Sequence, residues 1–183
     1  MKIIAGSAKG TKLIPLKCKQ IRPTENRVKE ALFSILQFQI KNSNVLDLFA
    51  GSGQLALEAI SRGAAFCTCV DKSTYAHKIQ VENFKKAKLL NNNVKLLVCD
   101  SLQFIKKTNE NFNFIFLDPP YKSNLLLKAL LSAQEKLQPS GKIICEHHTK
   151  LIMPSNFYKL KLQKQHNYGR INLTIYEQKL TTN

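Results

Sequence analysis

Between residues 44 and 146, short apolar runs alternate with segments of helical periodicity, and this alternation restricts the chain to a small group of folds. The runs have the length and the continuous apolar character of strands that are buried on both faces of a parallel sheet. Strands separated by helices form parallel β-α-β units, with helices on both faces. The sequence therefore predicts an α/β fold with strands over 44–49, 67–70, 94–99, 113–117 and 142–146, and with helices over 55–63, 74–90 and 125–137 and a short one after Asp100.

The segments on either side of this core have other patterns. After Pro154, residues 157–165 and 171–179 alternate apolar and polar side chains, which predicts a terminal antiparallel hairpin. Residues 2–16 predict two short strands, and Thr24 is placed to cap a helix over 25–39. We therefore divide the chain into an N-terminal hairpin-and-helix extension, residues 1–41, and a core, residues 42–183.

The chain of 183 residues is strongly basic, with 28 Lys and Arg against 12 Asp and Glu and a net charge of +16. Most of the excess lies in residues 1–30 and 150–183. Such a charge indicates a polyanionic partner, with nucleic acid as the first candidate and an anionic membrane surface as the second. No apolar run approaches the ~18 residues of a membrane span, and the first residues do not resemble a secretory signal, so we expect a cytoplasmic protein.

The five cysteines, at positions 18, 67, 69, 99 and 145, contain no C-x-x-C pair. A zinc site needs paired ligands, so no metal is expected. We expect four of the cysteines to be small buried strand residues.

Four aspartates lie at or next to the ends of successive predicted strands, namely Asp47, Asp71, Asp100 and Asp118. Any one of them could simply cap the following helix. The carboxyl ends of parallel strands form the ligand-binding edge of an open α/β sheet, so the four together predict a binding site.

The loop Ala50-Gly51-Ser52-Gly53 joins the first predicted strand to its helix. Glycine permits positive φ and a close approach of the backbone to a ligand, and the helix that follows offers free N–H groups. Asp71 lies 20 residues after Gly51, where a carboxylate can bind ribose hydroxyls. Loop and carboxylate together predict an adenosine-type ligand, either NAD or another nucleoside cofactor.

The tetrapeptide Asp118-Pro119-Pro120-Tyr121 follows the fourth predicted strand. Two prolines fix φ and remove two backbone donors, which leaves a rigid loop of carbonyl oxygens, a carboxylate and an aromatic ring. Such a loop suits the exocyclic amine of a planar base, with Asp118 and the Pro119 carbonyl as acceptors and Tyr121 stacked on the ring.

The segments VLDLFAGSG and LDPPY resemble the motifs of S-adenosylmethionine-dependent amino-methyltransferases. RPTENRVKEALFSIL at 22–36 and YGRINLTIYE at 168–177 resemble the RsmD family of bacterial guanine-N2 methyltransferases of small-subunit ribosomal RNA. The resemblance implies a Rossmann-like, seven-stranded methyltransferase sheet, preceded by an extension that contacts RNA. It also implies methyl transfer to a guanine of 16S rRNA, free or within the assembling or assembled small subunit. We expect a monomer, because the sequence has no sustained apolar surface pattern.

The resemblance also assigns site residues by motif position. Ala50, Gly51, Ser52 and Gly53 would hold the methionine part of the cofactor, Asp71 the ribose and Asp100 the adenine amine. Asp47, Lys72 and Ser101 complete the expected cofactor site. Asp118, Pro119, Pro120 and Tyr121 would hold the target guanine. The expected RNA contacts are Lys9, Lys12, Arg22, Thr24 and Arg27, with the arginines preferred for bidentate phosphate binding. Two positions depart from the family pattern: Asp71 is often Glu, and Ser73 stands where a second acid is common.

Three other functions are compatible with parts of the pattern. An adenine-N6 methyltransferase acting on DNA or RNA would use the same acceptors for its amine. A non-catalytic RNA-binding assembly factor could keep the fold, although the intact motifs argue against it. An NAD-linked oxidoreductase would leave the Asp118-Pro119-Pro120-Tyr121 loop unexplained.

Overall fold

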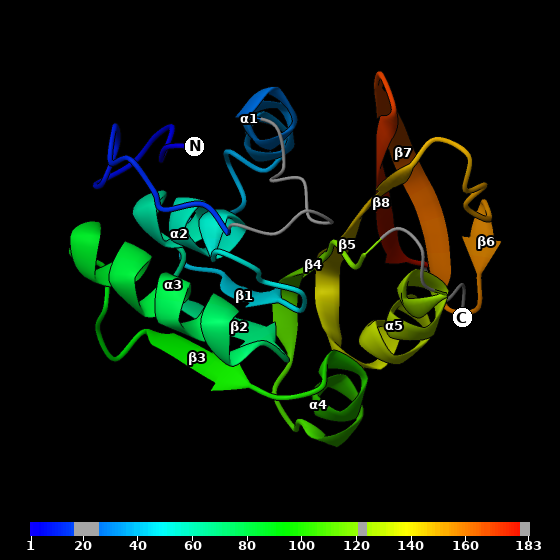
Figure 1. Cartoon of the computed structure of the whole chain (residues 1–183). Helices are drawn as coiled ribbons and strands as arrows, with labels where there is room; N and C mark the ends of the chain where they lie inside the picture. Colours follow the sequence, from blue (N-terminus) through cyan, green and yellow to red (C-terminus); the bar gives the residue numbers. More distant parts are fainter. Residues whose placement is uncertain (17–25, 121–123, 180–183) are drawn as a thin grey trace.

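The computed structural model describes residues 1–16, 26–120 and 124–179, which form one sheet flanked by helices (Figure 1). The strands are β1 Asn44–Asp47, β2 Phe66–Asp71, β3 Val94–Val98, β4 Phe112–Leu117, β5 Leu137–His148, β6 Asn156–Phe157, β7 Leu160–Tyr168 and β8 Ile171–Gln178. The helices are α1 Asn26–Ile35, α2 Gln54–Ser61, α3 Thr74–Lys86, α4 Ser101–Lys107 and α5 Leu125–Ala133, with a 3₁₀ turn at Gln134–Lys136. None of the helices in the described ranges is long and apolar enough to cross a membrane.

The sheet contains eight strands in the order β3-β2-β1-β4-β5-β8-β7-β6. The first five are parallel, as predicted, and the predicted terminal hairpin forms β7 and β8. β8 pairs antiparallel with β5 and so attaches the hairpin to the core. The sheet has one strand more than the expected seven, because the two-residue strand β6 folds back against the start of β7.

Side chains of the central strands alternate between two buried clusters, because successive strand residues point to opposite faces. Val45 of β1 and Phe114 of β4 belong to a cluster that includes residues of α1, α2 and α3. Leu46 and Ile115, their neighbours along the strands, belong to a second cluster with residues of α4 and α5. Helices α1, α2 and α3 therefore cover one face of the sheet, and α4 and α5 cover the other (Figure 1).

Residues 1–16 lie over α2, and the two predicted strands pair over a very short stretch. Within this fully described segment, one isolated bridge joins Lys2 to Lys12. The backbone amides of Ile4 and Ala5 donate instead to the Glu58 carboxylate of α2, at 2.8 and 3.0 Å. Three backbone hydrogen bonds join residues 1–3 to residues 10–13, so the predicted pairing is present in a minimal form, and the next residues bind the helix in place of extending it.

Three local boundaries differ from the predicted ones. Helix α1 ends at Ile35 and α3 ends at Lys86, and Lys88 has the left-handed φ of 57° that terminates a helix. The predicted turn at 139–141 is an irregularity inside β5, where Ser140 has φ 62° and the register with β4 shifts. A Cβ at Gly141 would lie 2.8 Å from the Asn113 carbonyl oxygen of β4, so the shift depends on glycine.

Three of the five cysteines, Cys67, Cys69 and Cys145, are fully buried strand residues. Cys99 is partly exposed, and Cys18 lies outside the described residues. Burial raises the pKa of the Cys145 thiol, so this thiol stays protonated and packs as a small apolar group.

Candidate functional site

The four aspartates predicted to mark the site are the only aspartates of the chain, and they lie at one edge of the sheet. Asp47 and Asp71 are the last residues of β1 and β2. Asp118 directly follows β4, and Asp100 caps the helix after β3. Because these strands are parallel and adjacent, their carboxyl ends meet along this edge.

The loop at 50–53 turns sharply between β1 and α2. Gly51 and Gly53 have φ of 52° and 78°, values that residues other than glycine rarely adopt. The Gly53 amide donates to the Ala50 carbonyl at 2.7 Å, which closes the turn. Helix α2 then begins at Gln54. Its N-cap residue, Gly53, has no side chain that could accept a hydrogen bond from the first amides of the helix, which point toward the loop.

Asp71 joins the glycine loop to the end of β2. One carboxylate oxygen accepts the Gly51 amide at 2.9 Å, and the other accepts the Ser73 amide at 2.9 Å. Ser73, at the position where the family pattern has a second acid, caps α3 by accepting the Ala76 amide at 3.1 Å. Lys72 between them is exposed.

Two buried amide side chains of α3 support the loop from behind, and the sequence analysis missed both. Gln80 donates to the Gly51 carbonyl at 3.0 Å. Asn83 donates to the carbonyls of Ser52 and Ile14, both at 3.0 Å, and accepts the Ile14 amide at 2.7 Å. Both residues are fully buried. The available signal was a polar residue at an inward position of the predicted helix.

Asp47 is 2% exposed and lies against the start of α2. Burial raises the pKa of this carboxyl to about 7, and the negative charge of Asp71 adds to the rise. Backbone hydrogen bonds from Ala56 and Phe49 oppose it. Near neutral pH, the Asp47 carboxyl therefore changes between its protonated and its charged form.

Asp100 and Ser101 form the corner between β3 and α4. Asp100 is exposed and accepts the Gln103 amide at 2.9 Å as the helix cap. Ser101 is buried and donates its hydroxyl to the Leu48 carbonyl at 2.6 Å. The serine hydroxyl thus connects α4 to the end of β1.

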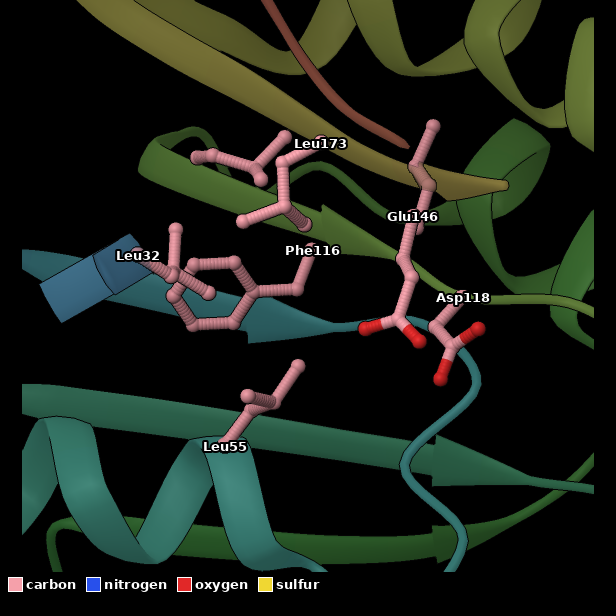
Figure 2. A pocket seen from close by; sticks show the side chains of 8 residues that line it. Leu32, Leu55, Phe116, Asp118, Glu146 and Leu173 are labelled. Carbon is pink, nitrogen blue, oxygen red and sulfur yellow. The ribbon is translucent and has the colours of Figure 1, made fainter. Parts of the chain in front are cut away.

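A small pocket opens where β4 and β5 end (Figure 2). Asp118 is partly buried beside it, Pro119 is buried and Pro120 is exposed. Tyr121 lies outside the described residues. A second acid, Glu146 of β5, lines the same pocket and is 4% exposed. The pocket is lined by Leu32, Leu55, Phe116, Leu117, Asp118, Ile144, Glu146 and Leu173.

Glu146 was also missed by the sequence analysis. It is the last residue of the predicted strand 142–146, and so it occupies the same kind of position as the four aspartates. Its position at the end of a strand was a usable signal, but Glu146 was interpreted as part of the strand only.

The predicted RNA contacts of the extension divide into two groups. Lys9, Lys12 and Arg27 are exposed, whereas Arg22 and Thr24 lie outside the described residues. Lys29, in the same basic segment, is fully buried. Its ammonium lies 3.3 Å from the Glu58 carboxylate and donates to the Lys2 carbonyl at 2.6 Å, while burial lowers its pKa. Lys29 therefore anchors the extension to α2.

The loop region has the donors and acceptors that an elongated polar ligand needs. Backbone amides lie at the start of α2, and the Asp71 carboxylate lies at the end of β2. Among the described residues, the side-chain oxygens of Gln54 and Gln80 are buried without a hydrogen-bond partner. Buried oxygens of this kind normally find a donor, so they fit a ligand that carries amino and hydroxyl groups.

Comparisons with known proteins agree with this geometry. The family described as conserved hypothetical protein 95 matches residues 1–177. A ribosomal RNA small subunit methyltransferase D of Buchnera aphidicola from Acyrthosiphon pisum is 38% identical, over 89% of this chain and 88% of the relative. A protein of the same name from Escherichia coli K12 is 30% identical, over 97% and 89%. The solved structure of a hypothetical protein from Thermus thermophilus superposes with a TM-score of 0.81 at 27% identity, covering 96% and 98%.

Proposed function

Because the chain belongs to the conserved hypothetical protein 95 family, the RsmD family, we propose that it transfers a methyl group from S-adenosylmethionine to the N2 amine of a guanine in 16S ribosomal RNA. The relatives named for methylation of small-subunit ribosomal RNA support this substrate. The structural observation that carries the proposal is that the glycine loop with Asp71 and the Asp118-Pro119 turn lie at the same edge of the sheet. The reaction takes place in the cytoplasm.

S-adenosylmethionine supplies a methyl group that its sulfonium centre already activates. The backbone of Ala50–Gly53 holds the amino-acid end, Asp71 the ribose and Asp100 the adenine amine. The uncapped amides at the start of α2 and the unpartnered oxygens of Gln54 and Gln80 support this arrangement. Gln80 and Asn83 add rigidity, because each hydrogen-bonds a carbonyl of the loop.

The target amine is a poor nucleophile, because its lone pair is delocalised into the guanine ring. Hydrogen bonds from its N–H groups to the Asp118 carboxylate and the Pro119 carbonyl favour a pyramidal nitrogen and stabilise the positive charge that develops on it. The nitrogen then loses one proton to Asp118 or to solvent. The main task of the protein is alignment of the amine with the methyl group. The nucleotide must be unpaired or flipped for the amine to reach the pocket.

The exposed cations of the extension supply the RNA contacts, and Arg27 is the strongest candidate because a guanidinium can bind phosphate bidentately. The substrate is 16S ribosomal RNA, free or within an assembling or assembled small subunit, and it is bound by a monomer. An Arg27→Glu variant should bind RNA more weakly, with a smaller dependence of the affinity on salt. An unchanged affinity and salt slope would remove Arg27 from the interface.

The first experiment is a methyl-transfer assay with labelled S-adenosylmethionine. The substrates are unmethylated small ribosomal subunits, the free RNA and duplex DNA, followed by mass analysis of the nucleosides. N2-methylguanosine from the subunit or its RNA is the expected product. N6-methyladenine would overturn the substrate assignment, and absence of transfer to all three substrates would overturn the catalytic proposal.

The Asp118→Ala variant tests the base site in the same assay. We expect it to lose turnover while its affinity for the cofactor stays within a few-fold of the wild type, because Asp118 follows β4 and the cofactor loop follows β1. Glu135→Ala is the matched control, since Glu135 is an exposed acid that pairs with Lys159 on the surface. A nearly normal rate of Asp118→Ala would contradict the proposed role.

A further inference from the structure

We propose that Glu146 determines the choice of guanine over adenine by accepting a hydrogen bond from the guanine N1–H. This inference rests on the proposed function and concerns how the same site selects its base. The role of Asp118 leaves the selection open, because Asp118 and the Pro119 carbonyl offer the same acceptors to any exocyclic amine.

The pairing of β4 with β5 places Glu146 next to Asp118. Leu117 of β4 is paired with Cys145 of β5, so the residue after each lies one position further along the same ladder. Neighbouring parallel strands lie about 4.8 Å apart, which is within the reach of a single base edge. Figure 2 shows the two carboxyl groups next to each other, on one side of the pocket that both residues line.

Both acids project to the face of the sheet that α1 and α2 cover. Phe116 and Ile144, two positions before Asp118 and Glu146, belong to the cluster on that face, and side chains two apart in a strand share a face. On the other side of β5, Glu146 is paired with Leu173 of β8, a member of the same cluster. The position of Glu146 is therefore determined by strands on both sides.

The rest of the pocket is apolar. Leu32 of α1 and Leu55 of α2 line it from the helices, and Phe116 and Leu173 line it from the sheet (Figure 2). The Phe116 ring is held edge-on by Phe33, with 5.8 Å between the ring centroids. The pocket itself has room for little more than a water molecule, so the edge of the base meets the two carboxylates and the ring does not enter. The apolar neighbours lower the local dielectric, which strengthens a hydrogen bond to a carboxylate.

The Watson–Crick edge of guanine matches two adjacent carboxylates. Guanine carries a donor at N1 and two donors at N2, whereas adenine has an acceptor at N1. Glu146 accepts N1–H, while the Asp118 carboxylate and the Pro119 carbonyl accept the two N2–H groups. Adenine would direct the N1 lone pair at the Glu146 carboxylate, so the same geometry that favours guanine disfavours adenine.

The test uses RNA in which the methylated guanine, located first by mass mapping of the wild-type product, is replaced by 2-aminopurine. This base keeps the N2 amine but has an acceptor at N1. The wild type should prefer guanine by at least about tenfold in kcat/KM, the size of one hydrogen bond to a charged group. In Glu146→Gln the preference should fall by a similar factor, because the amide can donate to N1 of 2-aminopurine.

The preference ratio is measured within one preparation, so it does not depend on how much of a variant is folded. Glu135→Gln makes the same chemical change at an exposed acid and should keep the wild-type ratio. Equal wild-type rates on guanine and 2-aminopurine would overturn the inference without any variant. An unchanged ratio in Glu146→Gln would also overturn it, and both results would leave the proposed function intact. Absence of N2-methylguanosine with the wild type would instead refute the proposed function.

Discussion

Asn83 is the residue whose loss should affect stability and cofactor binding together. Its side chain forms three hydrogen bonds, with the amide and carbonyl of Ile14 at 2.7 and 3.0 Å and with the Ser52 carbonyl at 3.0 Å. The side chain is fully buried, so water cannot readily replace these partners. Replacement by alanine leaves three backbone groups without their partner and separates the N-terminal segment from the glycine loop.

The expected cost follows from the number of bonds. A buried hydrogen bond contributes about 1 kcal/mol net, so Asn83→Ala should lower the free energy of unfolding by about 3 kcal/mol. For a chain of this size, that corresponds to a decrease of roughly 6–12 °C in Tm. Asn83→Asp should cost more, because a buried carboxylate would face the carbonyl oxygens of Ile14 and Ser52.

Urea unfolding and thermal unfolding measure the loss of stability. Titration with S-adenosylmethionine measures the affinity of each variant for the cofactor. Asn92→Ala makes the same change at an exposed asparagine and should stay within about 0.5 kcal/mol of the wild type. We expect Asn83→Ala to bind the cofactor more weakly than the wild type, and Asn92→Ala to bind it as the wild type does. Equal Tm values for the Asn83 and Asn92 variants, or an Asn83→Asp variant as stable as the wild type, would refute the reasoning.

Three further predictions concern buried or strained positions. Glu58→Gln should lower the free energy of unfolding by about 3 kcal/mol or more in urea, because two cations and two backbone amides share this fully buried carboxylate. Gly6→Ala should destabilise the fold far more than Gly10→Ala in thermal unfolding. Both have positive φ, but a Cβ at Gly6 would lie 1.7 Å from the Ser61 carbonyl oxygen, while Gly10 has open space around it. For Asp47, whose pKa is raised to about 7, the folded state holds the proton more tightly than the unfolded state. The stability of the wild type relative to Asp47→Asn should therefore fall by about 1.4 kcal/mol per pH unit between roughly pH 4 and 7 and then level off; a difference that does not change with pH would contradict this.

The order of strands and helices was predictable because each element carries its own periodic signal. The apolar runs of the parallel strands and the alternation of the terminal hairpin need no information about distant residues. The four aspartates could be singled out for the same reason, since each lies at or next to the end of a predicted strand, and their roles stay predictions. The glycine loop was evident because Gly51 and Gly53 flank a single residue between a strand and a helix.

What the sequence did not reveal depends on contacts between residues far apart in the chain. Lys29 was one cation among many in a basic segment, yet its partner, Glu58, lies 29 positions later and removes it from the surface. Asn83 bonds Ile14 across 69 positions. No local pattern distinguishes such a residue from a polar residue on an exposed helix face, because its role is defined only when the partner segments meet.

These distant contacts have a common effect on the site. Helix α2 begins at the end of the glycine loop and carries Glu58, which holds the N-terminal segment by two backbone amides. Asn83 of α3 holds the same segment at Ile14 and the loop at Ser52. Buried polar groups such as these are satisfied in one arrangement only, so they fix the position of the basic segment relative to the cofactor loop. An apolar contact surface of similar size would tolerate sliding. Polar residues at these core positions therefore define one geometry between the segment proposed to contact RNA and the loop proposed to hold the methyl donor.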